Sequence, residues 1–195
     1  MLTGAYQSVA ILAVAITFYA VDSWLMHLYD PQRTYGSSRN WIYTTIAVIA
    51  IILIVAQPAV WPQLGLHTDA WWGLLVQAVG LVVFLGALAL HWWARMHLRQ
   101  FYAERSSDIQ PGQYLVDSGP YAYMRHPIYT SYFMLVIGLL LINPALPTLL
   151  VAIYAFVDFS LAPRREERLL IENVPGYAEY RIRTPRFFPR LDRHK

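Results

Sequence analysis

The sequence predicts an all-α integral membrane protein with about five transmembrane helices. Hydrophobic residues make up 57% and charged residues only 14% of the 195 residues, whereas soluble domains carry roughly 25% charged residues. The apolar residues gather in long runs, and about 20 helical residues cover the hydrocarbon core of a bilayer. Polar, aromatic and basic segments separate these runs. The length fits a single domain.

The first three apolar runs are each long enough to span a bilayer. They cover residues 2–26, 41–61 and 72–92. Tryptophans bracket the second and third runs, as expected where indole rings settle at the membrane interfaces. The first run lacks a basic leader and a clear small-residue cleavage site, which disfavours a signal peptide. Asp22 lies near its end and is expected at the interface.

A second apolar region, residues 127–161, is interrupted by Asn143-Pro144-Ala145-Leu146-Pro147. Proline inside a helix removes a hydrogen bond, and Asn-Pro favours a turn. We therefore expect a helical hairpin of two short spans, 127–142 and 147–161. The basic stretch 91–108 either extends the third span or lies along the surface. The Arg- and Tyr-rich tail predicts a surface helix and then an extended segment that folds back against the membrane face.

The distribution of basic residues predicts the orientation. With five spans, every arginine and lysine that flanks a span falls on one side, which the positive-inside rule makes cytoplasmic. The N-terminus is then outside and the C-terminus cytoplasmic, in the cell inner membrane. Residues 1–195 form one membrane domain, with three spans in 1–94 and a cofactor-binding core in 95–195. Because the basic residues border spans, membrane lipids are expected partners and nucleic acid is not.

One polar motif precedes the hairpin, Arg125-His126-Pro127-x-Tyr129. Pro127 fits the first position of a helix, where its missing N–H costs nothing. His126 then lies near the N-cap, at a helix end that offers free N–H groups and a partial positive charge. This end suits a ligand carboxylate. The alternative is that Arg125 and His126 only anchor the helix to lipid headgroups.

A second charged motif follows the hairpin, Arg164-Arg165-Glu166-Glu167. Its glutamates suit a cationic ligand group and its arginines an anionic one; the alternative is a solvated charge run. The chain has no cysteine, which excludes a disulfide framework, a zinc–cysteine cluster and a cysteine nucleophile. His126 has no metal-ligand partner at helical spacing, so no metal site is expected. No G-x-S-x-G motif supports a serine hydrolase.

The two motifs belong to a longer order of residues. Before the hairpin, the order begins with Leu115-Val116, Gly119-Pro120-Tyr121 and the Arg125 motif. After the hairpin it continues with Glu166-Glu167, Leu170, Tyr177, Tyr180 and Pro185-Arg186-Phe187 with Pro189. This order resembles the isoprenylcysteine carboxyl methyltransferase family, within a wider group that includes membrane phospholipid N-methyltransferases. The resemblance covers about residues 113–191; the first two spans show no motif.

The resemblance implies a cytoplasmic pocket for S-adenosylmethionine, formed by the loop before the hairpin and the C-terminal segment. The residues that it assigns to the cofactor are Gln113, Leu115, Val116, Tyr121, His126, Pro127, Tyr129, Glu166 and Glu167. Gln113 stands where the family often has histidine. Ala162 stands where the family has the arginine that lies near the substrate carboxylate. Arg164 and Arg165 are therefore the candidates for orienting the substrate.

The implied reaction is methyl transfer to a lipophilic, isoprenylcysteine carboxylate-like acceptor. Methyl transfer from a sulfonium needs alignment and exclusion of water more than acid–base groups. Aromatic rings such as those of Tyr121 and Tyr129 suit a sulfonium or adenine neighbour. A phospholipid or another small molecule methylated at N, O or S is also compatible with the residues. Two other classes of protein, an NADPH-dependent membrane reductase and a non-enzymatic scaffold, are also compatible with the residues. The sequence does not indicate the oligomeric state.

Overall fold

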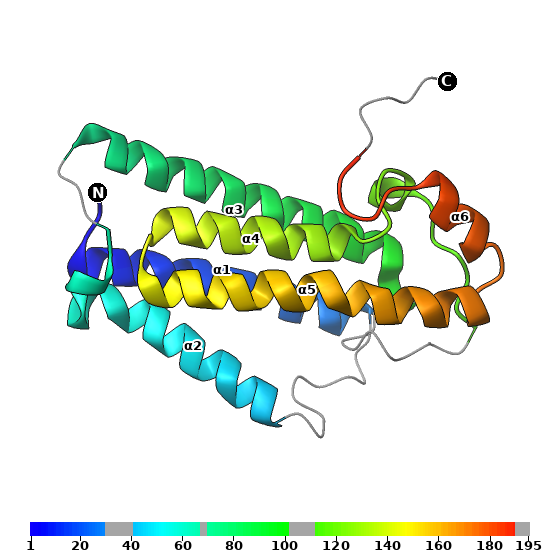
Figure 1. Cartoon of the computed structure of the whole chain (residues 1–195), viewed down its shortest axis with the longest axis horizontal. Helices are drawn as coiled ribbons and strands as arrows, with labels where there is room; N and C mark the ends of the chain where they lie inside the picture. The colour runs from blue at the N-terminus through cyan, green and yellow to red at the C-terminus, as the bar shows by residue number, and fades with distance from the viewer. Residues whose placement is uncertain (30–40, 67–69, 102–111, 190–195) are drawn as a thin grey trace.

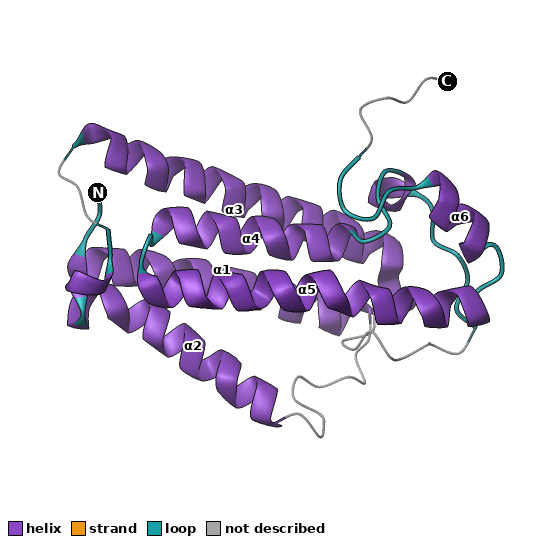
Figure 2. Ribbon diagram, viewed as in Figure 1, coloured by secondary structure: helices purple, strands orange, loops and turns teal. Residues whose placement is uncertain are grey.

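The computed structural model of the protein describes residues 1–29, 41–66, 70–101 and 112–189, and the regular elements in these ranges are helices. Figures 1 and 2 show helices joined by loops, with no strand in those ranges. The helices, in chain order, are α1 (Gly4–Tyr29), α2 (Trp41–Val60), the short 3-10 helix η1 (Pro62–Leu64), α3 (Trp71–Leu98), η2 (Arg99–Phe101), η3 (Gly119–Ala122), α4 (Pro127–Ile142), α5 (Leu146–Asn173) and α6 (Tyr177–Arg183).

Three of these helices, α1, α3 and α5, are long and apolar enough to cross a membrane. The helix α4 and residues Val48–Val60 of α2 are shorter apolar helices. Large apolar side chains such as Val82, Leu150 and Ile153 are exposed on the outside of the bundle, as expected for a surface that faces lipid. The predicted all-α membrane architecture is therefore confirmed, while the number of five crossings stays a prediction.

Helices α3 and α4 pack most extensively against each other, and small residues allow it. The buried positions of α3 include a repeat of small side chains at Gly73, Gly80, Ala87 and Ala94. Gly80 faces Gly138 of α4 so closely that a Cβ on either would meet the other's carbonyl oxygen at 2.8 Å. Small residues at such crossings let membrane helices approach backbone to backbone. This contact fixes α4, which carries the predicted cofactor motif at its start.

The glycine contact gives a stability prediction. Gly138→Ala should lower the stability of the detergent-solubilised protein by about 1–3 kcal/mol, because the new methyl group overlaps backbone atoms that cannot move aside. Gly86→Ala is the matched control, since its Cβ would meet only the flexible end of Met134, at 3.3 Å. Thermal unfolding should therefore separate the two variants. Equal melting temperatures would contradict the close packing of α3 on α4.

An ionic network lies inside the bundle, where the sequence predicts none. Asp22 is only 8% exposed, so its side chain is buried among the helices, while its expected depth at the membrane interface stays a prediction. Its carboxylate is 2.9 Å from Nε2 of His91 and 3.9 Å from Nε of Arg95. The other ring nitrogen of His91 lies 3.3 Å from the Ser131 hydroxyl. The network ties α1 to α3 and α4, and its charges are buried as a paired group, as intramembrane charges usually are.

Buried amides fasten the opposite end of the bundle, around the turn between α4 and α5. The carbonyl of Ile142 accepts hydrogen bonds from the side chains of Gln7, at 2.9 Å, and Gln77, at 3.1 Å. The side chain of Asn143 donates to the Thr148 hydroxyl at 3.0 Å. The predicted interruption at Asn143 is thus a turn that is hydrogen-bonded to α1, α3 and the first turn of α5. It allows α5 to run back along α4 (Figure 1).

Two helices extend further than the hydrophobic runs that predict them. The helix α3 continues to Leu98, so the basic stretch extends the third span as far as that residue. The helix α5 continues to Asn173 with Pro163 inside it, whereas the apolar run predicts an end at residue 161. The extension places the second charged motif on α5. After α6, the tail returns to the start of α4 (Figure 1).

Candidate functional site

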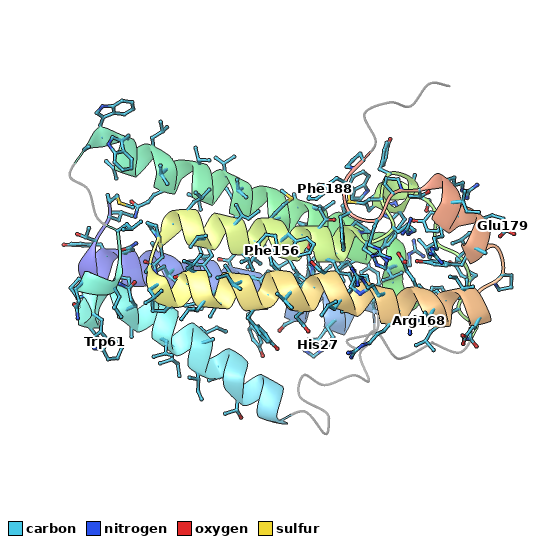
Figure 3. The ribbon with its side chains drawn as sticks, in the orientation of Figure 1. His27, Trp61, Phe156, Arg168, Glu179 and Phe188 are labelled. Carbon is cyan, nitrogen blue, oxygen red and sulfur yellow. The ribbon has the colours of Figure 1, made fainter. Side chains whose placement is uncertain are left out.

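The two predicted motifs meet at one end of the bundle. Figure 3 shows side chains of α5, α6 and the tail gathered around the labelled residues Arg168, Glu179 and Phe188, while Trp61 marks the opposite end. The start of α4, the second half of α5 and the tail all contribute to this group. Segments that lie about 40 residues apart in the sequence therefore form one polar cluster beside an apolar bundle.

The start of α4 has the geometry that the sequence predicts. Pro127 is the first helical residue and His126 is the N-cap. The backbone N–H groups of Arg125 and His126 donate to the carbonyls of Pro185 and Arg186 at 2.9 and 3.0 Å. The hydroxyl of Thr130 donates to the Phe187 carbonyl at 2.8 Å. The tail is thus hydrogen-bonded along the first turn of α4 and holds His126 in place.

Glu167 is the centre of the charge cluster. Its Oε1 accepts from Arg125 Nε at 2.9 Å and from His126 Nε2 at 3.0 Å. Its Oε2 accepts from Arg186 Nη2 at 2.6 Å. The carboxylate is 4% exposed, so these charged partners offset the cost of burying it. Glu167 therefore joins α5 to the start of α4 and to the tail.

Glu166 occupies a different position from its neighbour. Its side chain is 31% exposed, and its Oε2 lies 4.0 Å from Nδ1 of His126. A hydrogen bond joins it to Tyr129. Because an ionised carboxylate only accepts hydrogen bonds, His126 donates through Nε2 to Glu167 and turns Nδ1 toward Glu166. Glu166, His126 and Tyr129 therefore form a polar group whose accessible members are Glu166 and Tyr129, and whose buried member, His126, is held by Glu167.

The loop before α4 is held by the end of α3. Gly119 has a φ of +59°, and a Cβ there would lie 2.3 Å from Nε2 of His97. Both the backbone conformation and the close approach therefore require glycine. The turn brings Tyr121 into a buried cluster with Ala94 of α3 and Ile128 of α4. The hydroxyl of Tyr180, in α6, donates to the Tyr121 carbonyl at 2.7 Å.

Leu115 and Val116 pack in two different clusters. Leu115 lies against the cluster of Leu170, Val174, Tyr177 and Tyr180, which joins α5 to α6. Val116 lies against the cluster of Ala94, Tyr121 and Ile128. The segment that contains them therefore runs between α5–α6 on one side and α3–α4 on the other. Both residues are only partly buried, so each retains surface for a ligand.

Aromatic rings continue the site into the bundle. The rings of Tyr129 and Tyr132 lie 6.3 Å apart, and that of Phe159, from α5, lies 6.2 and 5.0 Å from them. The ring of His91 lies 5.5 Å from Tyr132. An aromatic wall between α4 and α5 thus connects this polar group to the buried ionic network.

The structure brings most of the predicted cofactor residues to this end of the molecule. Five of these residues are partly buried, namely Gln113, Leu115, Val116, Tyr129 and Glu166. The other four are buried, namely Tyr121, His126, Pro127 and Glu167. Both oxygens of Glu167 accept hydrogen bonds from Arg125, His126 and Arg186. Arg164 and Arg165 are exposed on α5. The assignment of all these residues to cofactor or substrate stays a prediction.

Some members of the site cannot be assigned from the sequence. Arg125 and Arg186 belong to the sequence motifs, yet nothing local shows that both bind Glu167. Asp22 and His91 are far apart in the sequence, and no spacing rule connects them. A charged residue within an apolar run is the available signal, because such residues usually face the interior or a functional site. Within the described ranges, no three His, Asp or Glu side chains form a metal-binding group.

Comparison with known proteins shows that this chain resembles one family. The family model of isoprenylcysteine carboxyl methyltransferase (ICMT) matches residues 78–172. A solved structure of a eukaryotic intramembrane Ras methyltransferase ICMT superposes with a TM-score of 0.70 over 92% of this chain and 65% of that one, at 21% identity. The two chains share a fold. Members of the family are integral membrane methyltransferases that use S-adenosylmethionine.

Curated relatives agree with the family match. The protein-S-isoprenylcysteine O-methyltransferase of Saccharomyces cerevisiae is 28% identical over 88% of this chain and 74% of its own length. The nickel-cobalt-cadmium resistance protein NccN of Alcaligenes xylosoxydans xylosoxydans is 26% identical over 78% of this chain and 65% of its own. The cobalt-zinc-cadmium resistance protein CzcN of Cupriavidus metallidurans is 39% identical over 42% of this chain and 38% of its own. The chain thus spans less than two thirds of both resistance proteins. The resemblance that the motifs indicate is confirmed.

Proposed function

Because residues 78–172 carry the sequence pattern of the isoprenylcysteine carboxyl methyltransferase family, we propose that this protein transfers a methyl group from S-adenosylmethionine to a lipophilic acceptor at the cytoplasmic membrane face. One observation carries the proposal. Tyr129 and Glu166, which lie on two different helices and are both partly exposed, come together beside the buried His126. The loop with Leu115, Val116 and Tyr121 lies beside them.

The residues present fit S-adenosylmethionine. Glu166 offers a partly exposed carboxylate to ribose hydroxyls or to an amino group. The partly buried ring of Tyr129 suits a sulfonium neighbour through cation–π contact. Leu115 and Val116 offer apolar surface for a purine ring. When bound, S-adenosylmethionine supplies a methyl group activated by the positive charge on sulfur.

The chain's own contribution is to orient the reactants and to exclude water. The wall formed by Tyr129, Tyr132 and Phe159 is aromatic and leads to Glu166 and His126, so an acceptor that enters between α4 and α5 would be surrounded by rings that exclude water. Glu167, which also binds Arg125 and Arg186, fixes His126 and so holds the residues on the donor side in place. A carboxylate acceptor needs no base, because it is already deprotonated at neutral pH.

The acceptor side differs from the family pattern. Ala162 stands one helical turn before Glu166, where the family has arginine. Arg125 and Arg186 are bound to Glu167, and Arg164 and Arg165 are exposed. We favour an isoprenylcysteine carboxylate-like acceptor that Arg164 or Arg165 orients. A phospholipid amine or another small lipophilic molecule is the alternative. Because position 162 has no arginine to bind a substrate carboxylate, this alternative should be tested as well.

Ligand binding tests the donor assignment. Purified protein in detergent should be stabilised by S-adenosylhomocysteine and should bind it with measurable heat in calorimetry, while NADPH should do neither. Stabilisation by NADPH alone would indicate a reductase instead. If neither ligand binds, and if His126→Ala, Tyr129→Phe and Glu166→Ala change nothing, the protein is a scaffold and the proposal fails.

The orientation is a separate prediction. The end of the bundle that carries the site also carries arginines, among them Arg125, Arg168 and Arg183. The described residues that form the opposite end belong to 1–29, 41–66 and 70–78, and these ranges contain no lysine or arginine. Because the chain has no cysteine, single cysteines can report the topology. In right-side-out vesicles, a membrane-impermeant maleimide should label Thr3→Cys and leave Glu179→Cys unlabelled until the vesicles are opened. The reverse pattern would contradict a cytoplasmic site.

A further inference from the structure

One hydroxyl group near the site is buried without a hydrogen-bond partner. Tyr177 is the first residue of α6 and is 5% exposed. Its Oη finds no hydrogen-bond partner among the described residues. Buried polar atoms of this kind are uncommon in folded proteins, and each requires an explanation, such as a bound molecule. The cofactor residues predicted from the sequence do not include Tyr177.

The surroundings of Tyr177 place it beside the proposed cofactor site. Its ring packs in the cluster of Leu170, Val174 and Tyr180, against which Leu115 also packs. Leu170 lies one turn after Glu166 on α5, so both point to the same side of that helix. Tyr177 therefore shares a cluster with Leu115, a predicted cofactor residue on the loop. It also lies next to the face of α5 that carries Glu166, a second predicted cofactor residue.

The charges around Tyr177 keep its hydroxyl protonated. Burial raises the pKa of this phenol far above its ordinary value, and the nearby negative charges of Glu167 and Glu166 raise the pKa further. The group is thus a hydrogen-bond donor at every physiological pH. The carboxylate of Glu167 does not take this proton, because Arg125, His126 and Arg186 occupy its oxygens.

Tyr180 provides a contrast within the same short helix. It lies almost one turn after Tyr177, is also buried, and donates its hydroxyl to the carbonyl of Tyr121 at 2.7 Å. Its hydroxyl therefore has a structural role, since it ties α6 to the loop before α4. The hydroxyl of Tyr177 has no such role in the described part of the chain, although its ring packs in the same cluster.

We propose that the Tyr177 hydroxyl donates a hydrogen bond to bound S-adenosylmethionine and that Tyr177 is a further cofactor-binding residue. This inference rests on the proposed function. The acceptor is a neutral atom of the adenosine part, a ribose oxygen or a ring nitrogen, because a buried phenol packed among apolar side chains suits an uncharged partner. The apolar surface of the partly buried Leu115, which packs against the cluster of Tyr177, suits the adenine ring.

Tyr177→Phe tests this inference without requiring the methyl acceptor. Removal of a hydroxyl that has no protein partner should leave the melting temperature of the ligand-free protein unchanged or slightly higher. The dissociation constant for S-adenosylhomocysteine in calorimetry should rise by about 3- to 10-fold, as expected for one neutral hydrogen bond.

Tyr180→Phe is the matched control. It leaves the Tyr121 carbonyl without its donor and should lower the melting temperature of the ligand-free protein. Tyr177→Phe contradicts the inference if it binds S-adenosylhomocysteine as tightly as the wild type, or if it loses as much ligand-free stability as Tyr180→Phe. Failure of the proposed function looks different, because then the wild-type protein itself does not bind S-adenosylhomocysteine.

Discussion

Replacement of Glu167 by alanine is expected to cost about 3–5 kcal/mol and to detach the tail from the start of α4. The reason is that Arg125, His126 and Arg186 would lose their common counter-charge while Arg125 and His126 stay buried, with side chains 9% and 3% exposed. Removing one partner of a buried ion pair is far more costly than the pair is stabilising. Thermal unfolding in detergent and limited proteolysis of the tail both measure the effect.

The control for this prediction is an exposed carboxylate on the same chain. Glu179 lies on the outer side of α6 (Figure 3) and is exposed. The free energy of unfolding of Glu179→Ala should therefore differ from that of the wild type by no more than about 0.5 kcal/mol. A Glu167→Ala protein with a wild-type melting temperature and a protease-resistant tail would show that the cluster around Glu167 does not hold the site together. The account of His126 as a fixed residue would then fail.

Replacement of the neighbouring Glu166 by glutamine should lower ligand affinity and leave the stability of the protein almost unchanged. The substitution preserves size but removes a charge that is 31% exposed, so the melting temperature of the ligand-free protein should change little. The affinity for S-adenosylhomocysteine should fall by about 10- to 100-fold, because a hydrogen bond to a charged group contributes about 1.5–3 kcal/mol. Calorimetry on the folded variant measures this loss.

The two glutamates form a matched pair in which each serves as a control for the other. Glu167→Ala should lose stability even without ligand, whereas Glu166→Gln should keep stability and lose binding. If Glu166→Gln binds S-adenosylhomocysteine as the wild type does, the polar group of Glu166, His126 and Tyr129 is not the donor site. If both variants lose only stability, the cluster is structural throughout.

Most of the fold could be predicted because membranes impose simple rules on sequence. Long apolar runs predicted the helices, and the Asn143–Pro147 interruption predicted the turn between α4 and α5. Hydropathy did not predict the end of α5, because the loss of apolar residues after 161 marks the end of the apolar stretch and not the end of the helix, which continues to Asn173. Pro163 removes one hydrogen bond, yet the helix continues through it.

The site could be predicted only where its chemistry is local in the sequence. The helix start at Pro127 with His126 as N-cap follows from adjacent residues, and a family motif marked Glu166. The partners of Glu167 come from α4 and from the tail, and no local rule pairs them. The same is true of Asp22 and His91, which meet at 2.9 Å from different helices. Such pairings depend on helix packing, which apolar patterns do not specify.

Methyl transfer itself is the most direct test of the central claim. Purified wild-type protein, incubated with S-adenosylmethionine labelled in the methyl group and with a membrane lipid extract, should place label in a lipophilic product. Glu166→Gln, assayed as a folded protein, should place far less, and mass spectrometry of the product identifies the acceptor. Equal labelling by wild type and Glu166→Gln, or no labelled lipid from a wild-type protein that binds S-adenosylhomocysteine, would contradict the claim.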